Sequence, residues 1–175
     1  TYREKGFKLG LLSCRVGNVV YFVSHLNPFL LQKRKQEALA IGKLVAAANK
    51  AGRDVIVLGD MNSVSPYDQS IYSIESPYSW YEKHTPGGQP PGSLDSSVLI
   101  TLGLFGLSDM QAQFQPGMLV RPTCIVANPP WGARIDFILA SPKIASHATA
   151  AWVADAPQRR VWSDHLPVIL DYKSF

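Results

Sequence analysis

The first fifty residues alternate between strand-like and helix-like arrangements of apolar positions. Two short apolar runs, 9–16 and 19–23, flank Gly17-Asn18, a pair that tolerates positive φ, so this stretch predicts a β-hairpin or tight turn between strands. After it, Asn27 is a favourable N-cap residue and Pro28 suits the first helical position, where its missing N–H is no loss. The pattern therefore predicts a helix that follows the hairpin closely.

The predicted helix covers residues 29–50 and is stopped by Gly52. Its apolar positions recur at the spacing of one helical face, with charged residues mostly on the opposite side. The basic cluster 33–35 (Lys-Arg-Lys) belongs to that charged side, and we interpret it as a solvated surface. The apolar positions are Leu30, Leu31, Ala38, Leu39, Ile41, Leu44, Val45 and Ala48.

The rest of the chain predicts further strands, a second helix and one long irregular segment. Residues 54–58 (Asp-Val-Ile-Val-Leu) form a short continuous apolar run, typical of a strand buried on both faces. Residues 63–97 are rich in Ser, Pro, Tyr and Gly without a strong period, and such segments within a compact domain are more often functional than idle. A helix is expected over 98–107 and strands over 135–139 and 168–172. This order of elements predicts a mixed α/β sandwich.

Composition and charge narrow the class of protein. The length of 175 residues suits one domain, 1–175, and a hydrophobic content of 46% with 17% charged residues argues against disorder. No apolar run approaches the roughly 18 residues of a membrane-spanning helix, which excludes membrane insertion. The formal charge of +4 permits a polyanionic partner without requiring one. Two cysteines without metal-site or disulfide-framework spacing favour an intracellular protein, although the compartment stays open.

Polar residues gather where three of the predicted strands meet loops. The first group is Gly59-Asp60-Met61-Asn62, directly after the buried strand. Its carboxylate and amide oxygen, two residues apart, are hard ligands for Mg²⁺ or polar contacts for a phosphate. The alternative is that Asp60 and Asn62 only form an Asx turn.

The second group is Ser163-Asp164-His165, just before the last strand. Asp164 offers a metal ligand, and His165 offers a general acid or base because imidazole changes charge near neutral pH. The alternative is a capped loop whose histidine has a structural role.

The third group places Asp136 inside an otherwise apolar strand, where a carboxylate is costly unless it is paired. A histidine partner would explain it, as in hydrolases where an aspartate fixes the imidazole tautomer. An ion pair with Arg134 or Arg121 is the alternative. A further histidine, His25, stands between a strand and the long helix, where it is either a second acid, a donor to a phosphate oxygen or a structural residue.

The ordered set of His25-Leu-Asn, Gly-Asp60-Met-Asn, Arg-Ile-Asp136 and Ser-Asp164-His-Leu-Pro-Val resembles the endonuclease/exonuclease/phosphatase superfamily, the deoxyribonuclease-I-like enzymes. The similarity extends from about His25 to Leu170. It implies a four-layered α/β sandwich, in which two mixed β-sheets pack face to face between outer helices. It also implies hydrolysis of phosphodiesters with Mg²⁺ or Mn²⁺ as cofactor.

The resemblance gives three residues roles at the water and the phosphate. Asp60 would orient or deprotonate the attacking water, and Asn62 would hold a phosphate oxygen. His25 matches the family histidine ahead of the long helix, which binds phosphate or protonates the leaving oxygen. These roles are expectations that the fold has to permit by bringing the three segments together.

Three other residues take roles from the C-terminal motifs. Asp136 would orient His165, and His165 would contact the scissile phosphate as a base or as a stabilising donor. Asp164 would be the metal ligand. A divalent ion there would offset charge on the phosphoryl oxygens.

The beginning of the chain departs from the family pattern. Family members start with a strand that carries an Asn and a segment that carries a metal-binding Glu, whereas Glu4 is the only acid in the first 24 residues and its setting does not match. The resemblance therefore covers about the C-terminal two-thirds of the usual domain. We expect weak metal affinity, and exposed strand edges that a complementing N-terminal segment or self-association covers.

The substrate is expected to be a phosphodiester, and nucleic acid is favoured. Arg159 and Trp162 flank the Asp164 loop closely enough to be the predicted substrate contacts. A phosphatase, or a phosphodiesterase for phospholipids or inositol phosphates, is the alternative within the family. The alternative from outside the enzymes is a catalytically incomplete domain that acts as an interaction subunit.

Overall fold

A computed structural model describes residues 2–3, 6–68, 95–115, 121–126, 131–154 and 163–173. The strands are β1 (Tyr2–Arg3), β2 (Leu11–Val16), β3 (Val19–Ser24), β4 (Asp54–Asp60), β5 (Ser108–Asp109), β6 (Cys124–Val126), β7 (Trp131–Ala133), β8 (Asp136–Ala140), β9 (Ala148–Val153) and β10 (Val168–Tyr172). The helices are α1 (Leu31–Lys50), α3 (Ser97–Leu104), α4 (Met110–Phe114) and α5 (Pro142–His147), with a 3₁₀ turn η1 at Pro66–Asp68.

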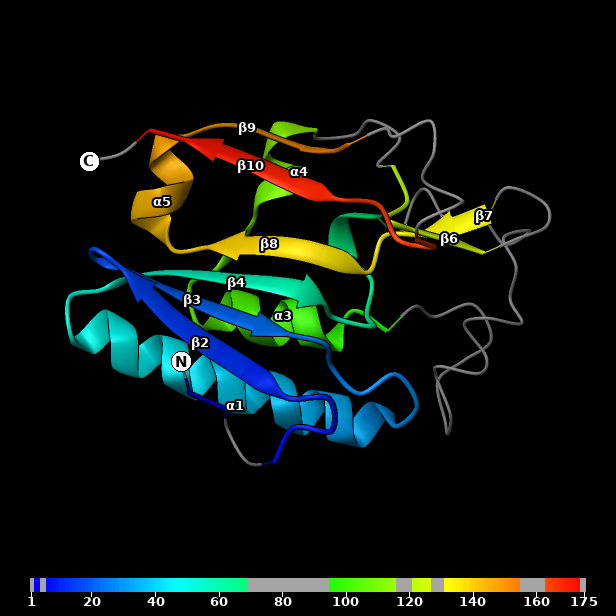
Figure 1. The fold of residues 1–175 in the computed structure, drawn as a ribbon, viewed down its shortest axis with the longest axis horizontal. Coiled ribbons are helices and arrows are strands. Elements are labelled where there is room, and N and C mark those ends of the chain that lie inside the picture. Colours follow the sequence, from blue (N-terminus) through cyan, green and yellow to red (C-terminus); the bar gives the residue numbers. More distant parts are fainter. Residues whose placement is uncertain are drawn as a thin grey trace.

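Most strands form one mixed sheet, in the order β1-β2-β3-β4-β8-β5. β3 and β4 are parallel, and the neighbouring pairs β2–β3 and β4–β8 are antiparallel. β9 and β10 form a separate antiparallel pair, as do β6 and β7 (Figure 1). The predicted α/β class with a mixed sheet is confirmed. In the described part of the chain, however, the second sheet is much smaller than the one that the family resemblance implies.

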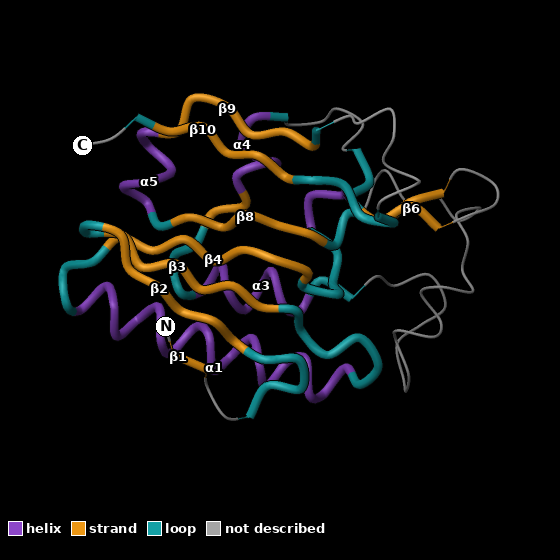
Figure 2. The backbone as a smooth tube through the Cα atoms, in the orientation of Figure 1, coloured by secondary structure: helices purple, strands orange, loops and turns teal. Residues whose placement is uncertain are grey.

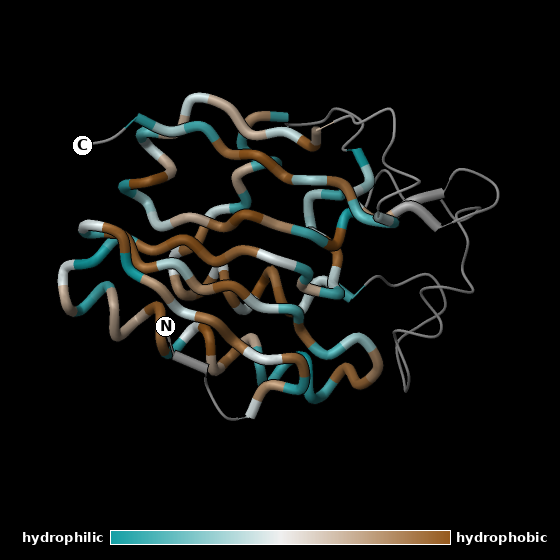
Figure 3. Tube along the Cα trace, viewed as in Figure 1, coloured by the Kyte–Doolittle hydropathy of each residue, from teal (hydrophilic) through white to brown (hydrophobic). Residues whose placement is uncertain are grey.

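Each face of the mixed sheet has its own hydrophobic core. Helices α1 and α3 cover one face, where Ile41 and Leu102 pack against alternate residues of β4 and β8 such as Val57 and Leu139. Helices α4 and α5 and the β9–β10 pair lie on the other side (Figure 2), where Ile144 joins a second core. The strands between these layers are largely hydrophobic (Figure 3). None of the helices in the described ranges combines the length and apolarity needed to cross a membrane.

Several elements form where the sequence pattern predicts them. The hairpin turns at Gly17-Asn18, with Val16 paired to Val19, and Gly17 has a φ of 58°. The buried strand is confirmed and continues beyond residue 58 to Asp60, and β10 has the predicted bounds. The later helix is α3, which begins one residue earlier and ends three residues sooner than predicted.

The start of the long helix differs from the prediction. α1 begins at Leu31, and Asn27 does not cap it. The Asn27 side-chain oxygen instead accepts hydrogen bonds from the backbone N–H groups of Phe29 and Leu30, at 3.0 and 2.9 Å, which forms an Asx turn ahead of the helix. At the other end, Gly52 has a φ of 69°, so the predicted helix stop is correct.

The interpretation of 33–35 as a solvated basic cluster is wrong for Arg34, which is fully buried. Its guanidinium donates to the Asn27 carbonyl oxygen and pairs with Asp95, at 2.9 Å each. One helical turn on, the buried Glu37 carboxylate accepts the backbone N–H groups of Asn27 and Lys8, at 2.7 and 2.9 Å. Polar side chains of α1 therefore anchor the loop that follows His25.

The predicted apolar face of the long helix is also wrong at two positions. Leu30 and Leu39, which the pattern assigns to that face, are exposed.

Gly59 is the strand position that least tolerates a side chain. Its φ is 128°, and a Cβ atom there would overlap the Ser24 carbonyl oxygen of the neighbouring strand. We expect Gly59→Ala to lower the free energy of unfolding by about 3 kcal/mol, from backbone strain plus overpacking, as measured by urea denaturation. Gly52→Ala is the matched control: its φ of 69° is also positive but the space is open, so about 1 kcal/mol is expected. Equal losses would show that the Ser24 contact is unimportant.

Candidate active site

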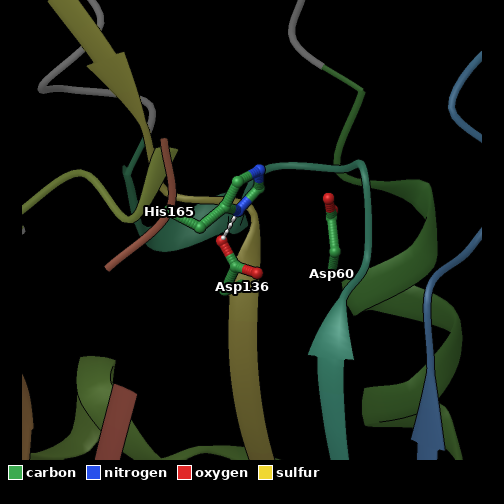
Figure 4. A group of neighbouring side chains, drawn as sticks. All are labelled: Asp60, Asp136 and His165. Atoms are coloured by element: carbon green, nitrogen blue, oxygen red, sulfur yellow. Dashed lines mark hydrogen bonds and ion pairs between the residues drawn. The ribbon is translucent and has the colours of Figure 1, made fainter. Parts of the chain in front are cut away.

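The register of two adjacent strands brings two carboxylates together. β4 ends and β8 begins at the right-hand edge of the sheet in Figure 1, and Asp60 pairs directly with Asp136 there. Because strand side chains alternate, both acids lie on the face that carries Ile56 and Ile138, opposite the face covered by α1. Figure 4 shows the two side chains at the ends of their strands, on the same side. Two of the predicted polar groups therefore converge.

His165 completes the cluster from the segment that leads into β10. Its Nδ1 lies 2.8 Å from the Asp136 Oδ2 in a hydrogen bond (Figure 4). Of the three partners considered for Asp136, namely a histidine, Arg134 and Arg121, the structure shows the histidine. The carboxylate favours the tautomer in which Nδ1 carries the proton, which leaves Nε2 facing away from Asp136. The His165 side chain is 33% exposed and the Asp136 side chain 19%, so the pair is accessible from solvent.

Arg134, one of the alternative partners considered for Asp136, binds Asp68 and Asp109 instead. Its buried guanidinium lies 2.8 and 2.9 Å from the two Asp68 oxygens and 2.9 and 2.6 Å from the two Asp109 oxygens. Burial alone would lower the pKa of the Arg134 guanidinium. The hydrogen bonds and negative charges of the two carboxylates outweigh burial and raise this pKa, so the guanidinium stays charged. Because Arg134 is two residues before Asp136, this network fixes the chain where β8 begins.

Asp60 does form an Asx turn, and it also faces the cluster. Its Oδ1 accepts the Asn62 backbone N–H at 2.8 Å, and Asn62 has a φ of 45°. Its Oδ2 lies 3.4 Å from Nε2 of His25. The Asn62 amide nitrogen donates to the Leu26 carbonyl oxygen at 3.0 Å, and the Leu26 N–H donates to the Asp60 carbonyl oxygen at 2.9 Å. The turn interpretation and the functional one are thus compatible.

Burial and the neighbouring acid change the protonation of Asp60. Burial raises the pKa of the Asp60 carboxyl to about 6, and the Asp136 charge adds to the effect. The Asn62 N–H and the two histidines, His25 and His165, act in the opposite direction. A carboxylate with such a pKa can accept a proton near neutral pH, as a general base must.

The histidine is shifted as well. Burial lowers the pKa of His165, but the hydrogen bond to Asp136 and the negative charges of Asp136, Asp60 and Asp164 outweigh it, so the pKa is raised. The cationic form is therefore favoured more than in a free histidine. In that form, Nε2–H is a donor for an anionic group.

Asp60, Asp136 and His165 could hold a metal ion, because each offers a ligand atom and these atoms lie within 4.8 Å of one another. Two carboxylates suit Mg²⁺ or Mn²⁺, and imidazole is a common ligand of transition metals. Asp164, the predicted metal ligand, is exposed and is not in this group. Arg159 and Trp162, the predicted substrate contacts, lie outside the described residues.

Sequence reasoning missed the residues that hold the cluster in place. Asp68 and Asp109 pair with Arg134 across 66 and 25 positions, and Thr123 binds the beginning of β8 across 13. No local pattern marks such partners. The only signal in the sequence was Arg134 next to an apolar strand, because an arginine that is buried there needs carboxylate partners.

The profile of the endonuclease/exonuclease/phosphatase family matches residues 5–165. The chain belongs to this family. Its members are phosphoester hydrolases, and the family typically uses divalent metals. The search of curated proteins found no match.

Solved structures share the fold at low sequence identity. The 3′ phosphatase NExo from Neisseria, in a variant form bound to product DNA hairpin, has a TM-score of 0.71 at 21% identity. The 3′-5′ exonuclease NExo from Neisseria meningitidis has 0.71 at 22%, and an AP endonuclease from Archaeoglobus fulgidus has 0.67 at 17%. Each match covers 94% of this chain and 65% of the other. The chain thus spans about two-thirds of the length of these family structures.

The raised pKa of Asp60 predicts a stabilising substitution. A carboxyl whose folded pKa of about 6 exceeds its unfolded value favours the fold below about pH 4, and that stability is lost as the pH rises through 6. We expect Asp60→Asn to raise the free energy of unfolding by about 2 kcal/mol at pH 8 without metal, and to change it little at pH 4. Urea denaturation at both pH values measures this. A destabilised variant at pH 8 would show that the carboxylate is not under electrostatic strain.

Proposed function

We propose that this protein is a divalent-metal-dependent phosphodiester hydrolase that acts on nucleic acid. The observation that carries the proposal is the convergence of Asp60, Asp136 and His165, with ligand atoms within 4.8 Å, at one edge of the sheet. Membership of a family of phosphoester hydrolases gives this cluster its expected chemistry.

In this mechanism Asp60 acts on the attacking water, whereas Asn62 and His25 act at the phosphate and its leaving oxygen. Asp60 accepts a proton from the attacking water, and its pKa of about 6 makes it ionised and basic at neutral pH. Asn62 donates one N–H of its side-chain amide to the Leu26 carbonyl oxygen, and it holds a phosphate oxygen with the other. His25, 3.4 Å from Asp60 and half exposed, binds phosphate or protonates the leaving oxygen.

Asp136 and His165 act as a unit in this proposal. Asp136 holds the imidazole at Nδ1, so that Nε2–H of the cationic ring donates to the scissile phosphate. Asp164, adjacent in the chain, would be the metal ligand, and a divalent ion there would supply positive charge to offset the charge on the phosphoryl oxygens. Arg159 and Trp162 are the proposed substrate contacts.

Nucleic acid is favoured over other phosphodiesters by two observations. The Neisseria phosphatase of similar fold is bound to a DNA hairpin, and this chain has a formal charge of +4, which suits a polyanion. A phosphatase, or an enzyme for phospholipids or inositol phosphates, is the alternative use of the same residues. A catalytically incomplete subunit is the second candidate.

The four-layered architecture belongs to the proposal too. On β2, Leu12 and Val16 are 43% and 65% exposed, and Cys14 between them is also exposed. Val16 pairs with Val19 of β3, and Val19 belongs to the hydrophobic core on the β9–β10 side of the sheet. The exposed side chains of β2 therefore lie on that same side. A complementing N-terminal segment or a second copy of the chain would cover this face and enlarge the second sheet.

Light scattering, which measures the mass of the protein in solution, distinguishes a second copy of the chain from a complementing segment as the cover of β2. If copies of the chain cover each other, we expect a dimer that Leu12→Lys converts to a monomer, because a charge cannot be buried there unpaired. A monomeric wild-type chain favours the complementing segment. A dimer that Leu12→Lys leaves intact would contradict coverage through this face.

The proposed activity is tested by hydrolysis of a DNA oligonucleotide, a simple aryl phosphodiester and a phosphorylcholine lipid, with Mg²⁺, Mn²⁺ or EDTA. We expect metal-dependent cleavage of DNA, lost by about 100-fold or more in Asp164→Asn and His165→Ala. His147→Ala is the matched control, because His147 ends α5, which Figure 1 shows at the opposite end of the strands from the point where β4 ends and β8 begins.

Each result separates the candidates. Cleavage of the lipid rather than DNA would assign the alternative substrate, and DNA binding that falls steeply with salt would support the nucleic acid. Folded wild-type protein that cleaves nothing with either metal would leave the interaction subunit as the better account. Loss of activity in His147→Ala would mean that the histidine substitutions act through the fold.

A further inference from the structure

Thr123 is fully buried and lies beside the first residues of β8. Its Oγ1 accepts two backbone hydrogen bonds, from the N–H groups of Ile135 and Asp136, each at 3.0 Å. One hydroxyl oxygen therefore satisfies two consecutive donors at the point where the strand begins. Asp136 is held at its backbone by this threonine and at its side chain by His165.

The backbone of Thr123 holds the other half of the pair. Its carbonyl oxygen accepts the Leu166 N–H at 2.7 Å, and the next residue, Cys124, forms an isolated antiparallel bridge with His165. The segment that carries His165 is thus pinned to the same residue as the segment that carries Asp136. A change at this one buried position would reach both side chains of the pair.

A third neighbour accepts a hydrogen bond from the hydroxyl. Thr123 donates its backbone N–H to the Ala133 carbonyl oxygen at 3.0 Å, and Oγ1 lies 3.4 Å from the same oxygen, to which it donates. With the proton on that side, the lone pairs of Oγ1 face the two N–H donors. Removing the oxygen would leave the N–H groups of Ile135, which is buried, and Asp136, which is partly buried, without this acceptor. An unpaired donor in the interior costs more than a hydrogen bond contributes.

We propose that Thr123 is a positioning residue that sets the geometry of the Asp136–His165 pair. The hydrogen bond between the two side chains is 2.8 Å, and Thr123 reaches the backbone on both sides of it. Catalytic groups have to be held within about 0.5 Å of their working geometry, and buried supporting hydrogen bonds do this. The kinetic consequence rests on the proposed function, whereas the effect on the pair itself does not.

The test compares three variants of the full chain. Thr123→Val has nearly the same shape but lacks the oxygen, and Thr123→Ser keeps the oxygen and lacks the methyl group. Ser141→Ala is the matched control: this buried hydroxyl also accepts one backbone N–H, from Val55 at 3.0 Å, at the far end of the same two strands. It removes a buried acceptor without touching the site.

The first measurement is kinetic, with the DNA substrate and metal that the wild-type protein uses. We expect Thr123→Val to lower kcat by about 10-fold or more with little change in KM, as loss of supporting partners does at other sites. Thr123→Ser and Ser141→Ala should stay within about two-fold of the wild-type protein. A Thr123→Val variant with the kcat of Ser141→Ala would overturn the proposal, and so would a Thr123→Ser variant as slow as Thr123→Val.

The second measurement needs no substrate and no metal. Long-range ¹H–¹⁵N spectra report which nitrogen of His165 carries the proton when the ring is neutral, at about pH 9 with EDTA. We expect the Nδ1–H tautomer in the wild-type protein, Thr123→Ser and Ser141→Ala, and a shift toward Nε2–H in Thr123→Val. An unchanged tautomer in Thr123→Val would overturn the proposal. If the wild-type protein cleaves nothing, the proposed function fails while this measurement still decides the role of Thr123.

A third measurement covers the case in which Thr123→Val does not fold. Amide hydrogen exchange of the wild-type protein should show Ile135 and Asp136 as protected as the central residues of β8, because Oγ1 of Thr123 holds both N–H groups. Exchange of both amides at the rate of exposed loops would show that the threonine does not hold the strand, and would overturn the proposal.

Discussion

The pairing register of β4 and β8 is the constraint on which the site depends. It sets Asp60 directly opposite Asp136, and like charges in that position destabilise a sheet. The molecule offsets this cost with His165 on Asp136, His25 beside Asp60 and the Asn62 N–H on the Asp60 carboxylate. A shift of one residue would turn one acid to the opposite face, so the apolar alternation that fixes the register also fixes the distance between the acids.

Keeping two acids in register requires that the chain be rigid where both strands meet loops. The Arg134 network with Asp68 and Asp109 and the Thr123 hydroxyl both act on the short segment before β8. On the other side, the Leu26 N–H binds the Asp60 carbonyl oxygen, and Glu37 binds the Asn27 N–H. Buried polar groups of this kind fix one geometry because any other would leave donors and charges unpaired.

Local patterns predicted the parts of this molecule that local physics decides. The hairpin, β4 and β10 follow from short apolar runs and turn residues, and the need for a partner on Asp136 follows from a carboxylate within an apolar strand. Tertiary contacts decided the rest. Arg34 looked solvated because its buried partner Asp95 is 61 positions away, and Asn27 looked like a helix cap although its turn precedes the helix. Family similarity, not periodicity, placed the distant motifs in one site.

The two pairs of neighbouring acids in this fold have partners of different kinds. Asp68 and Asp109 meet a guanidinium, a fixed charge that offsets them at every pH at which the protein folds. Asp60 and Asp136 meet imidazoles, whose charge depends on pH. Retaining titratable partners keeps negative charge available, which is what a metal ion or a proton from water would use.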